Sequence, residues 1–157
     1  MKSFELRKLI DKDHHSVRQV YQDAIQSQGH ILYTREQINA WSSLALLPGV
    51  LDRPLHEGQG WVSCHNQNIE AFAVRYPADR LALLYCRGRS ARSGHATALI
   101  NVVEQEARKE DQITLVAEAS LFSFSLFLRC GWVLKSPEKI KIGGVLFQRY
   151  LMEKELL

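Results

Sequence analysis

The sequence is poor in cysteine and proline and has no long hydrophobic run, and each shortage excludes a class of protein. Its 157 residues include three cysteines and four prolines. Cys64, Cys86 and Cys130 are odd in number, far apart and in no pair of zinc type, so we expect reduced, mostly buried thiols. No apolar run approaches the roughly 18 residues of a membrane span, and the N-terminus lacks the apolar stretch of a secretory signal. We therefore expect a cytoplasmic protein that binds no membrane.

Two common nucleotide-binding motifs are also missing. Neither GxxxxGK[ST] nor GxGxxG occurs, which excludes the P-loop and argues against a dinucleotide fold. Hydrophobic residues make up 46% and charged residues 24%, the average for globular proteins, so disordered and coiled-coil chains are excluded. The prolines are scattered singly, and no repeat or linker interrupts the chain. Length and composition together predict one domain, residues 1–157.

Apolar spacing predicts the secondary structure. Residues 4–10 alternate as in a strand, a helix follows Asp13 and stops before Gly29, and Thr34 with Gln37 caps a short helix that starts near Arg35. Residues 44–58 are predicted as loop, with a helical turn after Pro54. The later segments are strands 60–65, 69–76 and 81–86, a helix from Gly94 through Ala107, strand 113–119 and a short helix over 121–130. Two final strands close the chain as a hairpin, the first made of segments 132–136 and 140–142 and the second of residues 145–154. This order predicts a mixed α/β fold with mostly antiparallel pairing and one βαβ crossover.

Positive charge gathers in one segment. The formal net charge is only +3 and the pI about 8.8. Between residues 75 and 92, however, there are five arginines and one acid: Arg75, Arg80, Arg87, Arg89, Arg92 and Asp79. The segment is a candidate anion site, with a solvated basic turn as the alternative.

The sharpest local feature is the junction LLYCRGRSARSGHATALI, where an apolar strand passes through an arginine-rich loop into a helix. Gly94 and Ala96 let a ligand approach the backbone. The first turn of a helix carries unpaired N–H groups and positive potential, so residues 92–97 are a candidate cradle for a diphosphate. A simple tight turn before a helix is the alternative. For His95 we expect the backbone amide to bind the diphosphate and the imidazole to lie in solvent.

Four segments together resemble the GNAT superfamily of N-acetyltransferases, in particular its small single-domain bacterial branch. Residues 91–96 are similar to the family pattern Q/R-x-x-G-x-G/A, with Gly94 and Ala96 at the small positions and Ala91 where Gln or Arg is usual. The other three segments are VAEASLFSFSLFLRCGW, which ends at Trp132, the closing VLFQRYLMEKEL and the early YTREQINAW.

The resemblance implies a fold, a cofactor and a reaction. The fold is β-α-α-β-β-β-α-β-α-β-β, a mostly antiparallel twisted sheet with a central parallel splay and helices on both faces. Acetyl-CoA would lie between strands 81–86 and 113–119, and its acetyl group would pass to a primary amine of a small molecule or protein. The implied cofactor-binding residues are Leu84, Tyr85, Cys86, Arg89, Arg92, Ser93, Gly94, His95, Ala96, Thr97, Ser120 and Phe127.

Catalytic candidates follow from the needs of acetyl transfer to an amine. Phe127 stands where the family often has a tyrosine that acts as an acid, and strand 81–86 holds no acidic residue. Glu118 is the candidate general base, or the residue that binds a cationic acceptor. The alternative is a surface or edge-strand carboxylate with no role in the reaction. Tyr85 and Tyr150 are candidate proton donors, with buried, satisfied phenols as the alternative.

Other residues are assigned as follows. By the resemblance, His30, Tyr33 and Trp41 wall the acceptor pocket, and Trp41 serves equally well as a core residue. Cys130 fits a packed thiol better than a nucleophile. No metal site is expected, because the spacing of the remaining histidines suits no metal and they are predicted at the surface: His14, His15, His56 and His65.

Two other functions and one assembly are considered. A CoA-binding sensor or interaction module without turnover is the alternative to an enzyme. A nucleic-acid partner is not expected, because the basic segment lacks stacking aromatics and any known signature. Residues 145–150 suit edge-to-edge pairing with a second copy, so a homodimer stays open.

Overall fold

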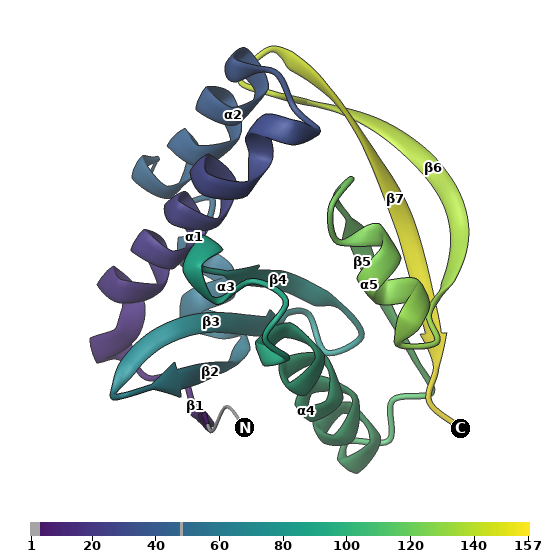
Figure 1. Ribbon diagram of the computed structural model, residues 1–157. Helices are drawn as coiled ribbons and strands as arrows, with labels where there is room; N and C mark the ends of the chain where they lie inside the picture. The colour runs from purple at the N-terminus through teal and green to yellow at the C-terminus, as the bar shows by residue number, and fades with distance from the viewer. Residues whose placement is uncertain (1–3, 48) are drawn as a thin grey trace.

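The computed structural model describes residues 4–47 and 49–157, and its elements follow the predicted order (Figure 1). The strands are β1 (Glu5–Lys8), β2 (Gln59–His65), β3 (Asn68–Arg75), β4 (Leu81–Cys86), β5 (Thr114–Ala119), β6 (Val133–Ile142) and β7 (Val145–Glu155). The α-helices are α1 (His14–Gln28), α2 (Arg35–Ser42), α3 (Asp52–Glu57), α4 (His95–Lys109) and α5 (Phe124–Arg129). Short 3-10 helices are η1 (Asp11–Asp13), η2 (Gly29–Ile31), η3 (Ser43–Leu46) and η4 (Gly88–Ser90).

The strands form two antiparallel sheets that meet at one point. One sheet has the order β1-β2-β3-β4 and the other β5-β7-β6. A single parallel bridge between Arg80 and Val116 joins them, supported by the hydrogen bond from the Val116 amide to the Asp79 carbonyl at 2.9 Å. Beyond this bridge no pairing joins β4 to β5 among the described residues. The expected fold with a central parallel splay is therefore confirmed.

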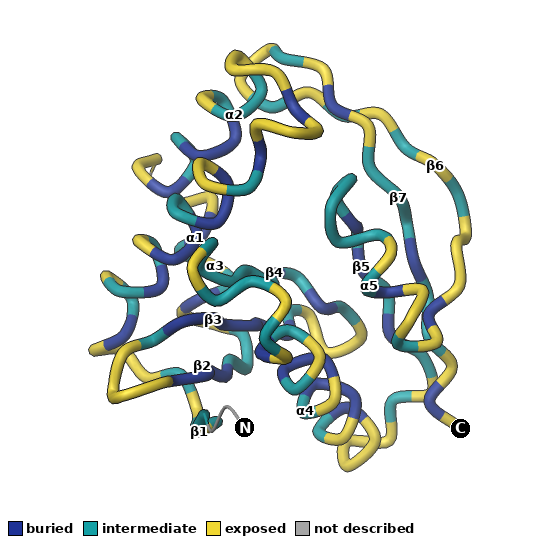
Figure 2. The backbone as a smooth tube through the Cα atoms, in the orientation of Figure 1, coloured by how far each residue is buried: buried dark blue, intermediate teal, exposed yellow. Residues whose placement is uncertain are grey.

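The first sheet is buried on both faces, and its two-residue period divides the core into two clusters. Val62, Phe72 and Val74 face α1, whereas Trp61 and Ala73 face α4. Buried residues accordingly follow one another along β2 and β3 (Figure 2). Helices thus cover both faces, and β4 is held rigidly at the edge that opens toward β5.

One segment differs from the prediction. The stretch predicted as loop contains η3 and α3, and α3 begins before Pro54 rather than after it. A proline in the first helical turn removes an N–H that would have no partner there, so it permits this start. The closing hairpin agrees with the prediction: its first strand, predicted from segments 132–136 and 140–142, is β6, which has an irregular register between Leu134 and Ser136.

The β6–β7 hairpin extends away from the sheet and meets α2 (Figure 1). The Gln37 side-chain amide donates to the Leu146 carbonyl at 3.0 Å. Strand β7 lies between β5 and β6, but residues 145–149 pair with β6 alone, because the pairing with β5 begins at Tyr150. This leaves one edge for the edge-to-edge homodimer, which stays a prediction.

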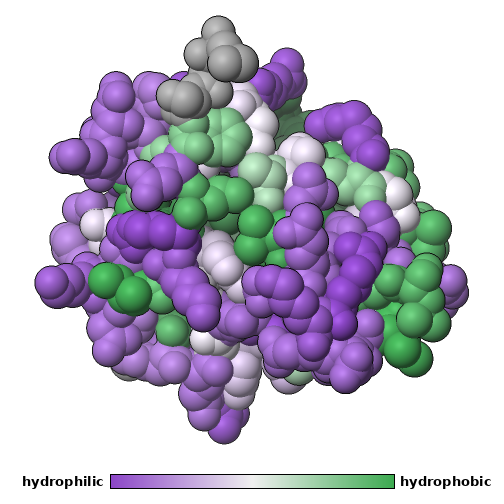
Figure 3. All heavy atoms as spheres, turned by 90° about the horizontal axis from the view of Figure 1, so that it is seen from below, coloured by the Kyte–Doolittle hydropathy of each residue, from purple (hydrophilic) through white to green (hydrophobic). Residues whose placement is uncertain are grey.

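Side chains on the face seen from below are mostly hydrophilic, interrupted by separate hydrophobic patches (Figure 3). None of the helices in the described part of the chain is both long and apolar enough to span a bilayer.

Candidate active site

A cavity of about 1140 Å³ lies where the sheet splays. Its walls come from the ends of α1 and α2, from β4, from the loop before α4, from β5 and the segment that follows it, and from the β6–β7 hairpin. Most of the predicted site residues line this cleft: His30, Tyr33, Trp41, Leu84, Tyr85, Cys86, Arg92, Gly94, His95, Ala96, Thr97, Glu118, Ser120 and Phe127. Arg89, Ser93 and Tyr150 are not among its lining residues.

The loop that opens α4 has the geometry of an anion cradle. Arg92 and Gly94 both adopt left-handed backbone, with φ of 60° and 92°. The amides of Ala96 and Thr97 donate to no carbonyl or side chain in the described ranges. Unpaired amides at a helix N-terminus, with a glycine that gives access to them, suit a diphosphate. The residues present therefore fit the predicted anionic cofactor.

The arginine cluster does not face the cleft as a group. Arg75 pairs with Glu110, Arg80 with Glu118 and Arg89 with Glu70, and Arg87 donates to the Ile69 carbonyl. Of the five arginines, Arg92 alone lines the cleft and makes no ion pair within the described residues. Most arginines of the cluster predicted from charge alone therefore form ion pairs or hydrogen bonds within the protein.

An ion pair between Arg89 and Glu70 holds the loop before α4 against β3. The buried Glu70 carboxylate accepts from Arg89 Nε at 2.8 Å and Nη2 at 2.6 Å, and from Ser90 Oγ at 2.6 Å. The Arg89 guanidinium, helped by the Ser90 hydroxyl, lowers the pKa of Glu70 to about 2. The structure places Arg89 in this ion pair and does not support its predicted contact with the cofactor.

The His95 imidazole is buried, and the prediction that it lies in solvent is wrong. Its Nδ1 is 2.6 Å from the Ser63 hydroxyl, and its ring centroid is 4.3 Å from that of Phe4. Residues 95, 99, 103 and 107 form the buried face of α4. Extending that helical period back by one turn would have predicted the burial of this side chain.

The open edge of β4 presents backbone groups to the cleft. The Arg87 amide donates to the Glu70 carbonyl of β3 at 2.8 Å, so by alternation the main chains of Cys86 and Leu84 face the gap. In agreement, the Gln28 side chain donates to the Cys86 carbonyl at 2.9 Å from the end of α1. The Tyr85 main chain faces β3 instead, so Tyr85 contributes its side chain.

Tyr85 has a phenol that holds its proton strongly. Its ring packs against Tyr21 at 4.6 Å and Phe72 at 5.9 Å, and it lines the cleft. Burial raises the pKa of Tyr85 to about 12. Such a group donates hydrogen bonds at neutral pH and gives up its proton poorly.

Glu118 lies close to the point where the sheet splays. Its half-buried carboxylate pairs with Arg80, whose backbone forms the bridge to Val116. Spacing along the chain predicted Glu118 as a candidate but gave no sign of Arg80, which lies 38 positions earlier in the sequence.

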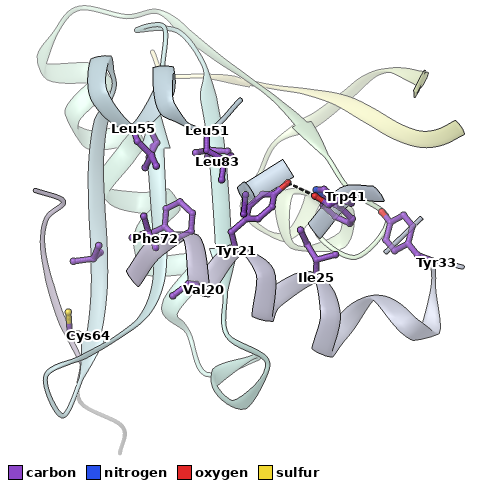
Figure 4. Packing of buried hydrophobic residues seen from close by; sticks show 14 of the residues in the cluster. Val20, Tyr21, Ile25, Tyr33, Trp41, Leu51, Leu55, Cys64, Phe72 and Leu83 are labelled. Carbon is purple, nitrogen blue, oxygen red and sulfur yellow. Dashed lines mark hydrogen bonds between the residues drawn. The ribbon is translucent and has the colours of Figure 1, made fainter. Parts of the chain in front are cut away.

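Aromatic side chains form the other end of the cleft. Trp41 is 8% exposed and also lines the cavity, so it is both a core residue and a wall residue. The Tyr21 hydroxyl donates to the Trp41 carbonyl at 3.1 Å (Figure 4). The Leu121 amide donates to the Tyr33 hydroxyl at 2.7 Å, and burial raises the pKa of Tyr33.

Several lining residues were missed at the sequence level, among them Gln28, Phe122, Ile140, Ile142 and Phe147. They come from four different segments, so no local pattern marked them.

Tyr150 lies beside the cleft and is not among its lining residues. Its ring packs on Phe124 with centroids 4.4 Å apart, and its hydroxyl accepts from the Gln148 side chain at 3.2 Å. Its role as a proton donor stays a prediction. Ser120 and Phe127 do line the cleft, but the Ser120 hydroxyl is within 2.9 Å of Ser123 Oγ, and Phe127 packs on Trp132.

The cysteines and the remaining histidines lie as follows. The three cysteines are free, and burial raises the pKa of Cys130, as expected for a packed thiol. Metal-type ligand atoms of Asp11, His14 and His56 lie within 4.8 Å of one another, a proximity that spacing did not predict. The Asp11 side chain is 96% exposed.

Solved structures share this fold. A GCN5-related N-acetyltransferase from Rhodopseudomonas palustris superposes with a TM-score of 0.93 at 22% identity, covering 99% of this chain and 97% of the other. PaiA N-acetyltransferase from Thermoplasma acidophilum, solved with coenzyme A, gives 0.73 at 16% identity and covers 98% and 99%. YncA of Salmonella typhimurium, solved with its cofactor acetyl-CoA, gives 0.69 at 15% identity and covers 99% and 95%.

Sequence comparison gives the family. A search of curated protein sequences returned no match. Residues 30–156 match the family model described as the acetyltransferase (GNAT) domain. The match confirms the resemblance drawn from the motifs and the enzyme class that it implied, an acetyltransferase that uses acetyl-CoA. This chain belongs to the GNAT family of acetyltransferases.

Proposed function

We propose that this chain, as one domain over residues 1–157, transfers the acetyl group of acetyl-CoA to a primary amine of a small molecule or protein. One observation carries the proposal. The open edge of β4 leads into unpaired amides at the start of α4, and the same cleft contains a carboxylate, Glu118.

The cofactor end is assigned to the backbone. The amides of residues 92–97 would hold the diphosphate, with the exposed Arg92 guanidinium beside it. The main chains of Leu84 and Cys86 would pair with the amides of the pantetheine arm. Acetyl-CoA bound in this way supplies the acetyl thioester. The complexes of PaiA with coenzyme A and of YncA with acetyl-CoA support this assignment.

Glu118 is assigned as the general base. An amine reacts only as its neutral form, so a group in the cleft has to accept a proton from the ammonium. The Glu118 carboxylate is the one acidic side chain among the described lining residues, and Arg80 holds it in place. Glu118 would bind the ammonium and take its proton, directly or through water.

Tyr85 is assigned as a hydrogen-bond donor to the sulfur. Its pKa of about 12 exceeds the roughly 8.5 of an ordinary thiol, so donation of the hydrogen bond is favoured and full proton transfer is not. Phe127 has no hydroxyl and would only pack.

The test combines binding with turnover. Calorimetry should show that the protein binds CoA, and a thiol reagent should report CoA release when acetyl-CoA and a panel of amines are supplied. Glu118→Gln should lower kcat about 100-fold while the Kd for CoA changes less than about twofold.

Glu153→Gln is the matched control. Glu153 is also on the second sheet and pairs with Lys135 at 3.8 Å, and it does not line the cleft. Absence of CoA binding would overturn the proposal. Tight CoA binding with no turnover on any amine would favour the CoA-binding module, a function consistent with Phe127 at the usual tyrosine position.

A further inference from the structure

We propose that the acceptor is a primary amine with an aromatic or bulky apolar body and with no second positive charge. This inference rests on the proposed amine acetylation and specifies its substrate class. The part of the cleft that carries it is called here the aromatic chamber: Tyr33, Trp41, Tyr85, Phe122 and Phe147.

Five separate segments supply the rings of the aromatic chamber. Trp41 and Phe122 stack with centroids 5.6 Å apart and an interplanar angle of 18°. Tyr33 contacts both rings edge-on, at 5.2 Å and 5.5 Å, and Phe147 closes the group at 6.0 Å from Tyr33. All five line the cleft as well as contacting one another, so a ligand here meets aromatic faces and edges.

Hydrogen bonds hold the Tyr33 ring and the backbone that carries Trp41 and Phe147 in place before any ligand arrives. The Leu121 amide bonds the Tyr33 hydroxyl, and the Tyr21 hydroxyl bonds the Trp41 carbonyl. The contact of Gln37 with the Leu146 carbonyl joins α2 to the hairpin that carries Phe147. A preorganised chamber selects its ligand by shape, because little side-chain entropy is lost on binding.

The chamber opens through an apolar rim. Ile31 and Leu32 line the cleft and are 78% and 47% exposed, and Ile140 and Ile142 line it from β6. An apolar body of the acceptor gains from burial against these four side chains.

The charges of the cleft favour an acceptor with one ammonium group. Among the described lining residues the permanently charged side chains are Arg92, Arg129, Arg149 and Glu118. One ammonium can pair with Glu118, the one carboxylate among the described lining residues. A second ammonium has no carboxylate left among the described lining residues and is repelled by Arg129, because Arg92 is assigned to the diphosphate and Arg149 pairs with Glu138 at 2.9 Å. A polyamine should therefore be a poor acceptor.

The first experiment compares three amines at fixed acetyl-CoA. We expect kcat/KM for 2-phenylethylamine to exceed that for spermidine and for ethanolamine by at least about tenfold, the scale set by burial of one apolar group. Phe122→Leu, which keeps much of the volume, should lower the value for 2-phenylethylamine several-fold and leave the Kd for CoA unchanged. Leu46→Ala, an exposed position outside the cleft, is the control and should change neither.

The second experiment does not depend on turnover. Of the three tryptophans, Trp61 and Trp132 are buried in the other core cluster, so Trp41 alone lines the cleft. With CoA present, 2-phenylethylamine should change the tryptophan fluorescence saturably, and Trp41→Phe should abolish the change.

The outcomes separate the two proposals. Turnover that prefers spermidine or ethanolamine would overturn the substrate class and leave amine acetylation standing. Saturable quenching without turnover of any amine would support the aromatic site and count against the proposed reaction. Neither quenching nor turnover with 2-phenylethylamine would overturn the inference.

Discussion

The two ends of the cleft are built in opposite ways. At the cofactor end the proposed diphosphate site is one continuous segment, residues 92–97, and the proposed ligands there are backbone amides. The aromatic chamber takes single side chains from positions as far apart as Tyr33 and Phe147. The first depends on local backbone conformation and the second on long-range packing. Substitutions at the two ends should therefore impair different properties of the protein.

The aromatic chamber is also part of the protein core. Tyr33, Trp41 and Phe147 belong to the hydrophobic cluster that packs under α1, whereas Arg92, Gly94 and Thr97 are exposed. A change in the chamber should cost folding stability together with acceptor binding. A change in the loop should act mainly on CoA affinity.

The largest effect is expected for Phe147→Ala. Phe147 is 4% exposed, and removing its ring leaves a cavity between α2 and β7, so the free energy of unfolding should fall by about 3 kcal/mol. Urea denaturation measures this. The neighbouring Leu146 is 53% exposed, and Leu146→Ala should cost less than about 1 kcal/mol. Equal losses for the two variants would show that the chamber is not part of the core.

Gly94→Ala should act mainly on cofactor binding. A methyl group would meet nothing closer than the Phe4 ring at 3.8 Å, so the cost comes from the left-handed backbone at φ +92°. An alanine at residue 94 would be strained by roughly 1–2 kcal/mol in this conformation. The backbone would relax to relieve that strain, which would turn the amides at the start of α4 away from the diphosphate, and the Kd for CoA should rise about tenfold. Calorimetry measures the Kd.

Gly49→Ala is the control for the same backbone penalty, with φ +89° and open space around it, away from the cleft. It should lower stability similarly and leave the Kd for CoA unchanged. A matching loss of CoA affinity in both variants would contradict a specific role for residue 94.

Glu70→Gln should have the smallest effect and a defined pH dependence. The pKa of Glu70 is depressed to about 2 in the folded state, below its ordinary value of about 4.3, so its contribution is full above about pH 5. That contribution is lost as the pH falls from about 5 toward 2. The Arg89 side chain is 63% exposed, and screening reduces the expected loss at pH 7 to about 1 kcal/mol.

Thermal unfolding at pH 7 and at pH 3 measures the stability lost in Glu70→Gln. The difference in stability between this variant and the unsubstituted protein should be smaller at pH 3. Glu57→Gln, which breaks an exposed pair with Arg53, should change stability at neither pH. A constant difference for Glu70→Gln across this range would contradict the role of the ion pair.

Prediction from sequence succeeded where one segment carried the whole signal. The element order, the glycine turn before α4 and the position of Glu118 were all visible in local patterns. It failed for side chains whose neighbours lie far away. The His95 ring packs on Ser63, and the loop arginines pair with distant acids such as Glu70.

The sequence by itself determined the backbone at the start of α4, because a glycine in left-handed conformation and the free amides of a first helical turn are properties of neighbouring residues. Only the tertiary structure decided which arginine faces the cleft and which rings enclose the aromatic chamber. Those choices depend on the Arg80–Val116 bridge, where the two sheets part, and on the hairpin reaching α2. Such contacts join residues far apart in the chain, and no local pattern encodes them.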